Sequence, residues 1–262
     1  MQVFENSGMH IHYCDERDTN EAPLVFSNSF GTDMRLRDKI IPSLPKGLRI
    51  IRYDMRGHGL SDCPRPPYSM GELISDVEAL LDHLNICDCF FVGLSIGGMI
   101  AQGLATKRLD LIRAMVLSNT ASKIATPAIW QDRIDSIRAT GIGPVSDTTM
   151  SRWFSPKMQA SSAMSPWHNM MRATRPEGYI GCAHAISGAD FIATTSTLRL
   201  PVMGIAGDHD GSTPPDLVRE TLNLIPGSTF HIIHGAGHLP CVEQPKEFAR
   251  LLTSLLETTG HI

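Results

Sequence analysis

The chain has 262 residues, of which 42% are hydrophobic and 19% charged, and its net charge is −4. This composition is typical of a globular α/β protein with a sizeable core. The negative balance argues against nucleic acid or an anionic membrane as a partner. No stretch approaches the roughly 18 uncharged apolar residues of a membrane span, and the first residues lack the features of a signal peptide. We therefore expect a cytoplasmic protein.

The six cysteines are scattered without the regular spacing of a disulfide framework. Cys87 and Cys89 are too close for an easy bridge, and no Cys-x-x-Cys pair or His/Cys cluster suggests zinc. We expect reduced, mostly buried thiols and neither a metal nor another cofactor.

Strand patterns alternate with helical patterns along the chain. The strand patterns cover residues 3–4, 11–13, 24–27, 49–53, 89–92, 114–117, 202–206 and 229–233. The first two flank Ser7-Gly8 and predict a hairpin. Ser69 and Glu72 form a capping box at the start of a predicted amphipathic helix, and further helices are expected over 96–106 and 245–256. This alternation predicts a mostly parallel sheet flanked by helices on both faces, with ligands gathered at the carboxyl ends of the strands.

One long segment interrupts the alternation. Residues 122–190 have no convincing strand pattern but contain two helical patterns and all three tryptophans. We interpret this segment as a helical cap inserted into a core made of residues 1–121 and 191–262. Seven Lys and Arg against five Asp and Glu give the cap a net charge of +2. This basic cap favours an anionic substrate, and a solvated helix face explains it nearly as well.

Residues 93–98 read Gly-Leu-Ser-Ile-Gly-Gly between a strand pattern and a helical pattern. This is a G-x-S-x-G turn in the structural context that its chemistry requires. The sharp bend lifts the hydroxyl of Ser95 clear of the sheet, and glycines on either side remove Cβ atoms that would collide across it. Ser95 is therefore the predicted nucleophile, although a Gly-rich turn is the simpler interpretation of such a motif.

A serine nucleophile needs a base that is itself held by a third group. His238 is the best candidate base, because it lies on a glycine-rich turn after the last strand pattern and in the chain order serine, acid, histidine. Asp208 and Asp210 both follow the strand pattern 202–206. We prefer Asp210 as the acid, because it precedes Pro214, which suits the first position of the next helix. Asp208 then forms the turn.

The oxyanion that forms during acyl transfer needs two aligned amides. Ile96 supplies one at the start of the helix after the bend, where the helix dipole helps. Phe30, in the loop after the strand pattern 24–27, is placed to supply the other.

With these residues placed, the chain resembles the α/β-hydrolase superfamily over essentially its whole length. Residues 54–61 carry its D-x-R-G-x-G-x-S loop. Within the superfamily the chain resembles the 3-oxoadipate enol-lactonases, on the motifs at residues 26–33, 93–99, 117–121 and 176–179. One departure is Arg37, where the family pattern leads us to expect tryptophan. We expect Arg37 to contact the surface of the first helix rather than the chemistry.

The resemblance implies the α/β-hydrolase fold, no cofactor, and hydrolysis of a small anionic enol lactone to 3-oxoadipate in the β-ketoadipate pathway of aromatic catabolism. A carboxylesterase or C–C bond hydrolase with the same triad is an alternative. A ligand receptor built on a hydrolase scaffold is a second alternative. The cap sets specificity, so sequence alone does not separate these functions.

An anionic substrate calls for a cation in the cap. Arg133 is the first choice, because it lies three residues after Trp130 and so on the same helical face, and a guanidinium matches a carboxylate with two hydrogen bonds. Arg138 is the second choice, and Trp153 is a candidate wall of the pocket. A solvated helix face is the alternative for either arginine.

Overall fold

The computed structural model describes residues 1–16 and 22–262. Residues 17–21, part of the predicted core, lie outside the described residues. The strands are β1 (Gln2–Asn6), β2 (Met9–Glu16), β3 (Leu24–Ser27), β4 (Ile50–Tyr53), β5 (Cys89–Leu94), β6 (Ile112–Ser118), β7 (Val202–Gly207) and β8 (Thr229–Ile233). They form one sheet in the order β1-β2-β4-β3-β5-β6-β7-β8. The β1–β2 and β2–β4 pairs are antiparallel and the pairs from β4–β3 to β7–β8 are parallel. The mostly parallel sheet is confirmed.

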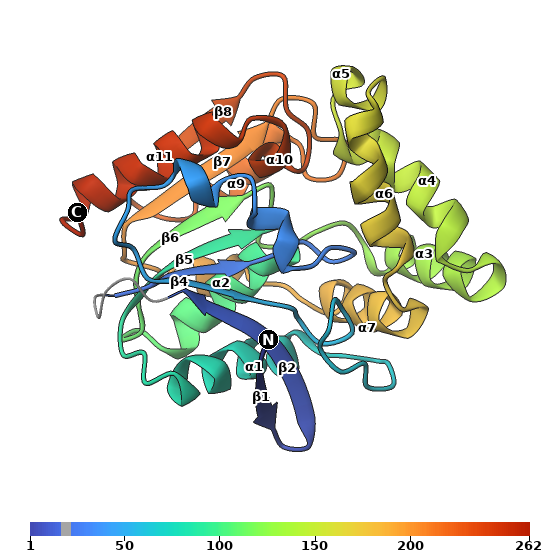
Figure 1. Cartoon of the computed structure of the whole chain (residues 1–262), viewed down its shortest axis with the longest axis horizontal. Helices are drawn as coiled ribbons and strands as arrows, with labels where there is room; N and C mark the ends of the chain where they lie inside the picture. The colour runs from blue at the N-terminus through green and yellow to red at the C-terminus, as the bar shows by residue number, and fades with distance from the viewer. Residues whose placement is uncertain (17–21) are drawn as a thin grey trace.

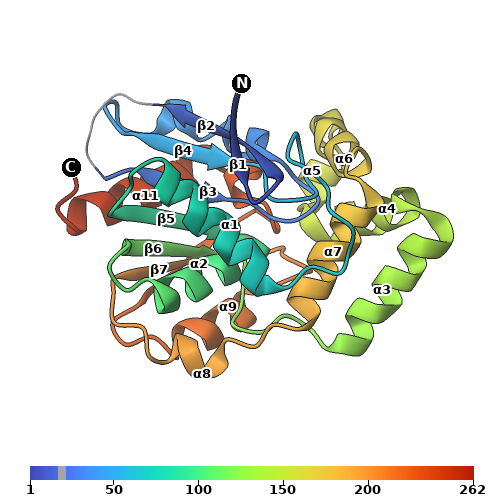
Figure 2. The same ribbon diagram turned by 90° about the horizontal axis from the view of Figure 1, so that it is seen from below.

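Helices cover both faces of the sheet, as the alternating pattern predicts. Helices α1 (Met70–His83) and α2 (Ile96–Lys107) pack on each other at one face, and α11 (Pro245–Thr258) lies on the opposite face (Figures 1 and 2). Ser69 caps α1 in the predicted capping box: its Oγ accepts from the Glu72 amide at 3.2 Å, and Glu72 Oε2 accepts from the Ser69 amide at 2.7 Å. Helix α9 (Pro215–Leu222) begins one residue later than expected, with Pro214 as its N-cap.

The segment between β6 and β7 is helical, and Figure 1 shows most of it gathered beyond the carboxyl ends of the strands. It contains α3 (Pro127–Thr140), α4 (Ile142–Trp153), α5 (Pro156–Gln159), α6 (Ser165–Arg172), α7 (Pro176–Ser187) and α8 (Ile192–Thr195). These helices are more numerous than the two patterns read from the sequence, because several have only four to eight residues. The boundaries of the cap at residues 122 and 190 stay a prediction.

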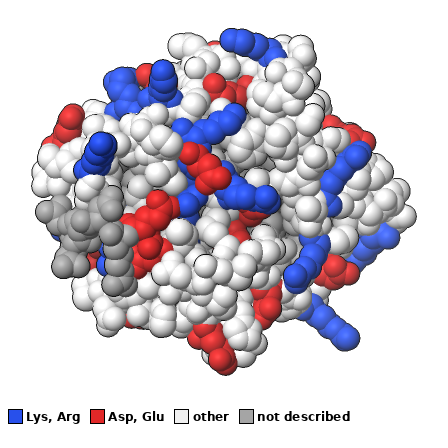
Figure 3. Space-filling view, viewed as in Figure 1, with Lys and Arg blue, Asp and Glu red and all other residues white. Residues whose placement is uncertain are grey.

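The surface carries charges of both signs. On the face drawn in Figure 3, Lys and Arg side chains are interspersed with Asp and Glu, over the cap helices as well as the core. In the two described stretches of chain, no helix is both long and apolar enough to cross a membrane. All six cysteines are free thiols, of which Cys89, Cys182 and Cys241 are buried.

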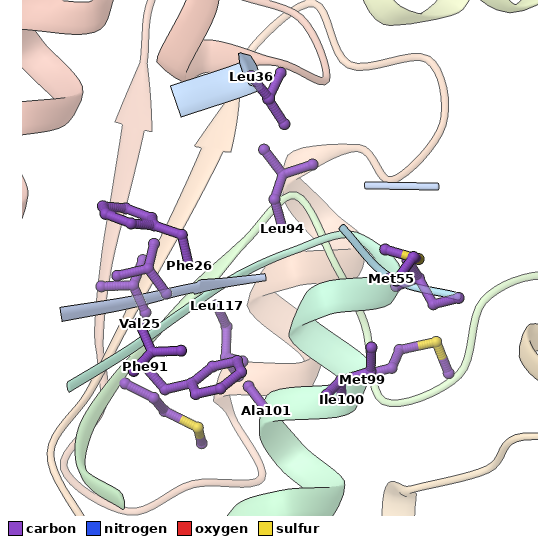
Figure 4. Close-up of a cluster of buried hydrophobic side chains, with 14 of the residues drawn as sticks. Val25, Phe26, Leu36, Met55, Phe91, Leu94, Met99, Ile100, Ala101 and Leu117 are labelled. Atoms are coloured by element: carbon purple, nitrogen blue, oxygen red, sulfur yellow. The ribbon is translucent and has the colours of Figure 1, made fainter. Parts of the chain in front are cut away.

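The core brings the central strands against α2. Figure 4 shows this cluster, in which Val25 of β3 and Phe91 of β5 lie with Ile100 of α2 and Leu117 of β6. None of these four side chains is exposed to solvent. Because β3, β5 and β6 are buried on both faces, their carboxyl ends are held at fixed positions, and the site is built there.

The expectation that Arg37 contacts the surface of the first helix is wrong. This residue ends the 3₁₀ helix η1 (Met34–Arg37) and is completely buried. Its Nε donates to Asn28 Oδ1 at 2.9 Å and its Nη2 to the Ser27 carbonyl at 3.1 Å. The guanidinium lies 5.1 Å from the centroid of the Phe26 ring. A planar guanidinium can stack on aromatic rings as another aromatic would. Arg37 can therefore fill this interior position, at which the family pattern leads us to expect tryptophan.

Candidate active site

The turn between β5 and α2 places Ser95 in a strained conformation. Its φ and ψ are 57° and −120°, a conformation that costs a non-glycine residue roughly 1–3 kcal/mol. A Cβ on Gly97 would lie 2.4 Å from the Ser27 carbonyl oxygen, and one on Gly93 would lie 2.3 Å from the Gly97 carbonyl oxygen. Only glycine therefore permits this bend, which places Ile96 at the first position of α2. The bend is the one that the G-x-S-x-G motif predicts.

His238 and Asp210 form a buried pair. The Nδ1 of His238 lies 2.9 Å from Asp210 Oδ2, and the two side chains are 1% and 0% exposed. The backbone amide of Ser212 donates to Asp210 Oδ1 at 2.7 Å. Burial by itself would raise the pKa of the Asp210 carboxyl, but the imidazole of His238 and hydrogen bonds that include those from Asn119 and Ser212 lower it to about 2. Asp210 is therefore ionised at neutral pH.

The rival carboxylate, Asp208, faces the surface. Its Oδ2 lies 3.0 Å from Nδ1 of His234, and its Oδ1 accepts from the Gly235 amide at 2.8 Å. His234 is 84% exposed. Asp208 therefore holds the turn after β8, in agreement with the preference for Asp210 as the partner of His238.

Ser95 and His238 line the same small cavity. The cavity has a volume of about 60 Å³ and is lined by Phe30, Ser95, Ile124, Ala125, Ile129, Trp130, Arg133, Arg152, Trp153, Ile186, Ser212, Thr213 and His238. Trp153 stacks on His238 with ring centroids 5.6 Å apart. The ring of Phe30 packs against Trp130 and Tyr179. The structure thus brings the predicted nucleophile, base and aromatic residues together under the helices between β6 and β7.

The two predicted cap arginines are placed differently. Arg133 lines the cavity, its Nη2 donates to Thr149 Oγ1 at 2.5 Å, and its Nε is buried. Among residues 1–16 and 22–262, no carboxylate pairs with Arg133 and no acceptor receives its Nε–H. Arg138 instead is 55% exposed and pairs with Asp135. We therefore carry Arg133, and not Arg138, into the proposed site.

Sequence reasoning missed several residues around this cavity. Arg152 lines it beside Arg133, and partial burial and the charge of Arg133 lower the pKa of Arg152. Ser29 Oγ lies 3.5 Å from His238 Nε2. Asn119 donates from Nδ2 to Asp210 Oδ2 at 2.9 Å. Only Asn119 had a signal in the sequence, namely its position directly after β6.

The loop that carries Phe30 is held by a buried histidine. The amide of Gly31 donates to His58 Nε2 at 2.8 Å, and His58 Nδ1 faces the Arg56 carbonyl at 3.2 Å. This geometry requires a neutral imidazole with its proton on Nδ1. Burial accordingly lowers the pKa of His58.

Comparison with known proteins agrees with this geometry. Residues 24–251 match the alpha/beta hydrolase family. The chain belongs to that family. It is 32% identical to 3-oxoadipate enol-lactonase 2 of Acinetobacter baylyi over 94% of this chain and 93% of the relative. It is 30% identical to 3-oxoadipate enol-lactonase 1 of the same organism over 91% and 90%.

A solved structure gives the same picture for this alpha/beta hydrolase. The enol-lactonase from Burkholderia xenovorans LB400 superposes with a TM-score of 0.93 at 31% identity, covering 98% of this chain and 100% of the other. The predicted fold and the predicted family are both confirmed.

The strained bend gives a first prediction. We expect Gly97→Ala to destabilise the protein by about 1–3 kcal/mol and to lower turnover strongly, because the new methyl group would collide with β3. Gly143→Ala in α4 is the control: a Cβ there meets open space, and the helix should gain up to about 1 kcal/mol. Urea unfolding and hydrolysis of p-nitrophenyl acetate measure both effects. Equal stability of the two variants would contradict the argument.

His58 gives a second prediction, on pH. Its pKa is lower in the folded protein than in the unfolded chain, so the unfolded chain binds more protons between the two values. The contribution of neutral His58 to the free energy of unfolding is complete above the unfolded pKa of roughly 6.5, and it is lost as the pH falls below that value. We expect the free energy of unfolding to decrease between pH 7.5 and pH 5.5, and to decrease less in His58→Gln. Parallel losses in the two proteins, measured by urea unfolding, would rule out His58 as the source.

Proposed function

We propose that this hydrolase opens a small anionic enol lactone, 3-oxoadipate enol-lactone, through an acyl-enzyme on Ser95. The observation that carries the proposal is the cavity lined by Ser95, His238 and Arg133. Asp210 pairs with His238, and Arg133 has no carboxylate partner among the described residues. The names of the two relatives at 32% and 30% identity support the substrate. The reaction then belongs to aromatic catabolism, as the resemblance implies. Residues 122–190 act as the lid over the cavity that contains Ser95.

In the proposed first half-reaction, His238 Nε2 takes the proton of the Ser95 hydroxyl while Oγ bonds to the lactone carbonyl carbon. The amides of Phe30 and Ile96 donate hydrogen bonds to the oxyanion. The ring C–O bond then breaks, and His238 returns the proton to the leaving enol oxygen. Asp210 holds the imidazole with its proton on Nδ1 throughout.

In the proposed second half-reaction, a water molecule gives a proton to His238 and attacks the acyl carbon. The Oγ–C bond breaks and Ser95 recovers the proton from His238, and the carboxylic acid product loses its own proton to solvent. The enol tautomerises to a ketone by moving its proton from oxygen to carbon. When this happens in the acyl-enzyme, before water attacks, the tethered oxygen has become a ketone oxygen that does not close the ring again, which favours this substrate over a saturated lactone.

Arg133 is the proposed partner of the substrate carboxylate, with Arg152 as a second positive charge in the same wall. A guanidinium with a buried unpaired N–H and no carboxylate partner among the described residues gains most from an anionic ligand. The indole rings of Trp130 and Trp153 exclude water from the cavity, and a lower dielectric strengthens the ion pair.

Replacement of the nucleophile tests the mechanism. We expect Ser95→Ala to lose several orders of magnitude in kcat on the enol lactone, because the groups of a triad act as a unit. Asp210→Asn should lose far more than Asp208→Asn, which serves as the matched control on the same loop. Retention of more than a tenth of the activity by Ser95→Ala would exclude the serine mechanism.

Turnover of p-nitrophenyl acetate but not of the lactone would favour the carboxylesterase alternative, and slow single turnover on both would favour the receptor.

Replacement of the cap cation tests the substrate class. We expect Arg133→Met to raise KM about tenfold or more for the acid and much less for its methyl ester, because only the acid forms the ion pair. Arg138→Met, at an exposed position of the same helix, is the control and should leave both KM values unchanged. Equal increases for acid and ester in Arg133→Met would contradict the ion pair.

A further inference from the structure

Glu243 joins the loop of His238 to the helical segment over the site. It is the last residue of α10 (Pro240–Glu243). Its Oε2 accepts from the Gly237 amide at 2.6 Å. Its Oε1 accepts from the Ser155 hydroxyl at 2.5 Å and from the Ser155 amide at 3.1 Å. The carboxylate of Glu243 therefore binds Gly237, the residue before His238. It also binds Ser155, which lies between α4 and α5 and 88 positions before Glu243 in the chain.

A second contact joins the same two segments. The amide of His238 donates to the Trp153 carbonyl at 2.7 Å, and the Trp153 ring stacks on the imidazole. A Cβ on Gly237 would lie 2.2 Å from the Trp153 carbonyl oxygen. The backbones are thus in direct contact, and the position of the imidazole depends on where residues 153–155 lie.

The acid loop is tied to the same segment. The Gly211 amide donates to the Arg152 carbonyl at 2.9 Å, and Arg152 Nε donates to the Gly211 carbonyl at 3.1 Å. Residues 152–155 therefore bond to the loop of Asp210 and to the loop of His238. We call the place where residues 152–155 meet these two loops the junction. The carboxylate of Glu243 makes charge-assisted hydrogen bonds there, which are shorter and stronger than neutral ones.

We propose that Glu243 is a positioning residue that orients His238 by fastening its loop to residues 153–155. Glu243 does not line the cavity that contains Ser95, so it acts through Gly237 and Ser155 rather than on the substrate. The helical segment then supplies more than a substrate pocket, since its attachment holds the general base. This inference rests on the proposed role of His238.

The test is Glu243→Gln, which keeps the size of the side chain but replaces one acceptor oxygen with an NH₂ donor. The NH₂ must face either the Gly237 amide or the Ser155 donors, and the junction loses a bond on that side. Because a small displacement of a reacting group can cost up to about 100-fold in rate, we expect kcat to fall about 10- to 100-fold. Glu247→Gln is the matched control, on an exposed carboxylate of α11 that pairs with Arg250.

Two substrates and one probe separate positioning from stability. The enol lactone and p-nitrophenyl acetate give kcat and KM, and phosphonylation of Ser95 by a small fluorophosphonate reports the serine–histidine pair without the lactone. A misplaced imidazole lowers kcat on both substrates and slows phosphonylation, while near-ultraviolet circular dichroism stays native. A rise in KM for the lactone alone, with unchanged phosphonylation, would overturn the proposal.

Ser155→Ala provides a second route if Glu243→Gln folds poorly. It removes the hydroxyl bond to Glu243 and the N-cap contact with the Met158 amide at the start of α5, but it keeps the bond from the Ser155 amide to Glu243, so it should lower kcat less than Glu243→Gln does. The double variant should be no slower than Glu243→Gln alone, because both changes break the same junction. Additive losses would overturn the coupling. Wild-type protein inert to the fluorophosphonate would overturn the serine mechanism and this inference with it, whereas labelled protein inactive on the lactone would overturn the proposed substrate only.

Discussion

The structure depends on the tight packing of three strand ends around Ser95. The Ser95 amide donates to the Ser118 carbonyl at 3.0 Å, and the Ser95 carbonyl accepts from Thr120 Oγ1 at 2.6 Å. The Ser27 carbonyl touches Gly97 from the other side. A strained residue persists only where its surroundings over-determine it, and here β3, β5 and β6 do so. The positions of the Phe30 loop, Ser95 and Asn119 follow from that packing.

Local patterns predicted the framework well. The strand boundaries lie within three residues of those expected, and the capping box at Ser69 forms as predicted, because such features depend on neighbours in sequence. Ser95 also had a local signal, since its glycines and flanking elements lie within a few positions. The choice of Asp210 over Asp208 used the spacing to the next helix, and the geometry agrees with it.

Contacts between distant parts of the chain were not predictable in the same way. Arg37 was expected to contact the surface of the first helix, because nothing nearby in sequence shows that it lies between Phe26 and Phe248. Glu243 meets Ser155 across 88 positions and Arg152 meets Gly211 across 59. Glutamate and arginine are ordinary surface residues in sequence, so their roles at the junction emerge only when the loops are placed.

Asn119 has a consequence for how the acid of such a site could change strands during evolution. Its amide already contacts the carboxylate that holds His238. A change of Asn119 to aspartate would place two carboxyl groups side by side, and like charges at that distance keep one of them protonated. Such an intermediate would still present one carboxylate to the imidazole, so a later loss of Asp210 would leave the histidine with a partner. Two single substitutions thus connect a site with its carboxylate at position 210 to a site with its carboxylate at position 119. In no intermediate does His238 lack a carboxylate partner.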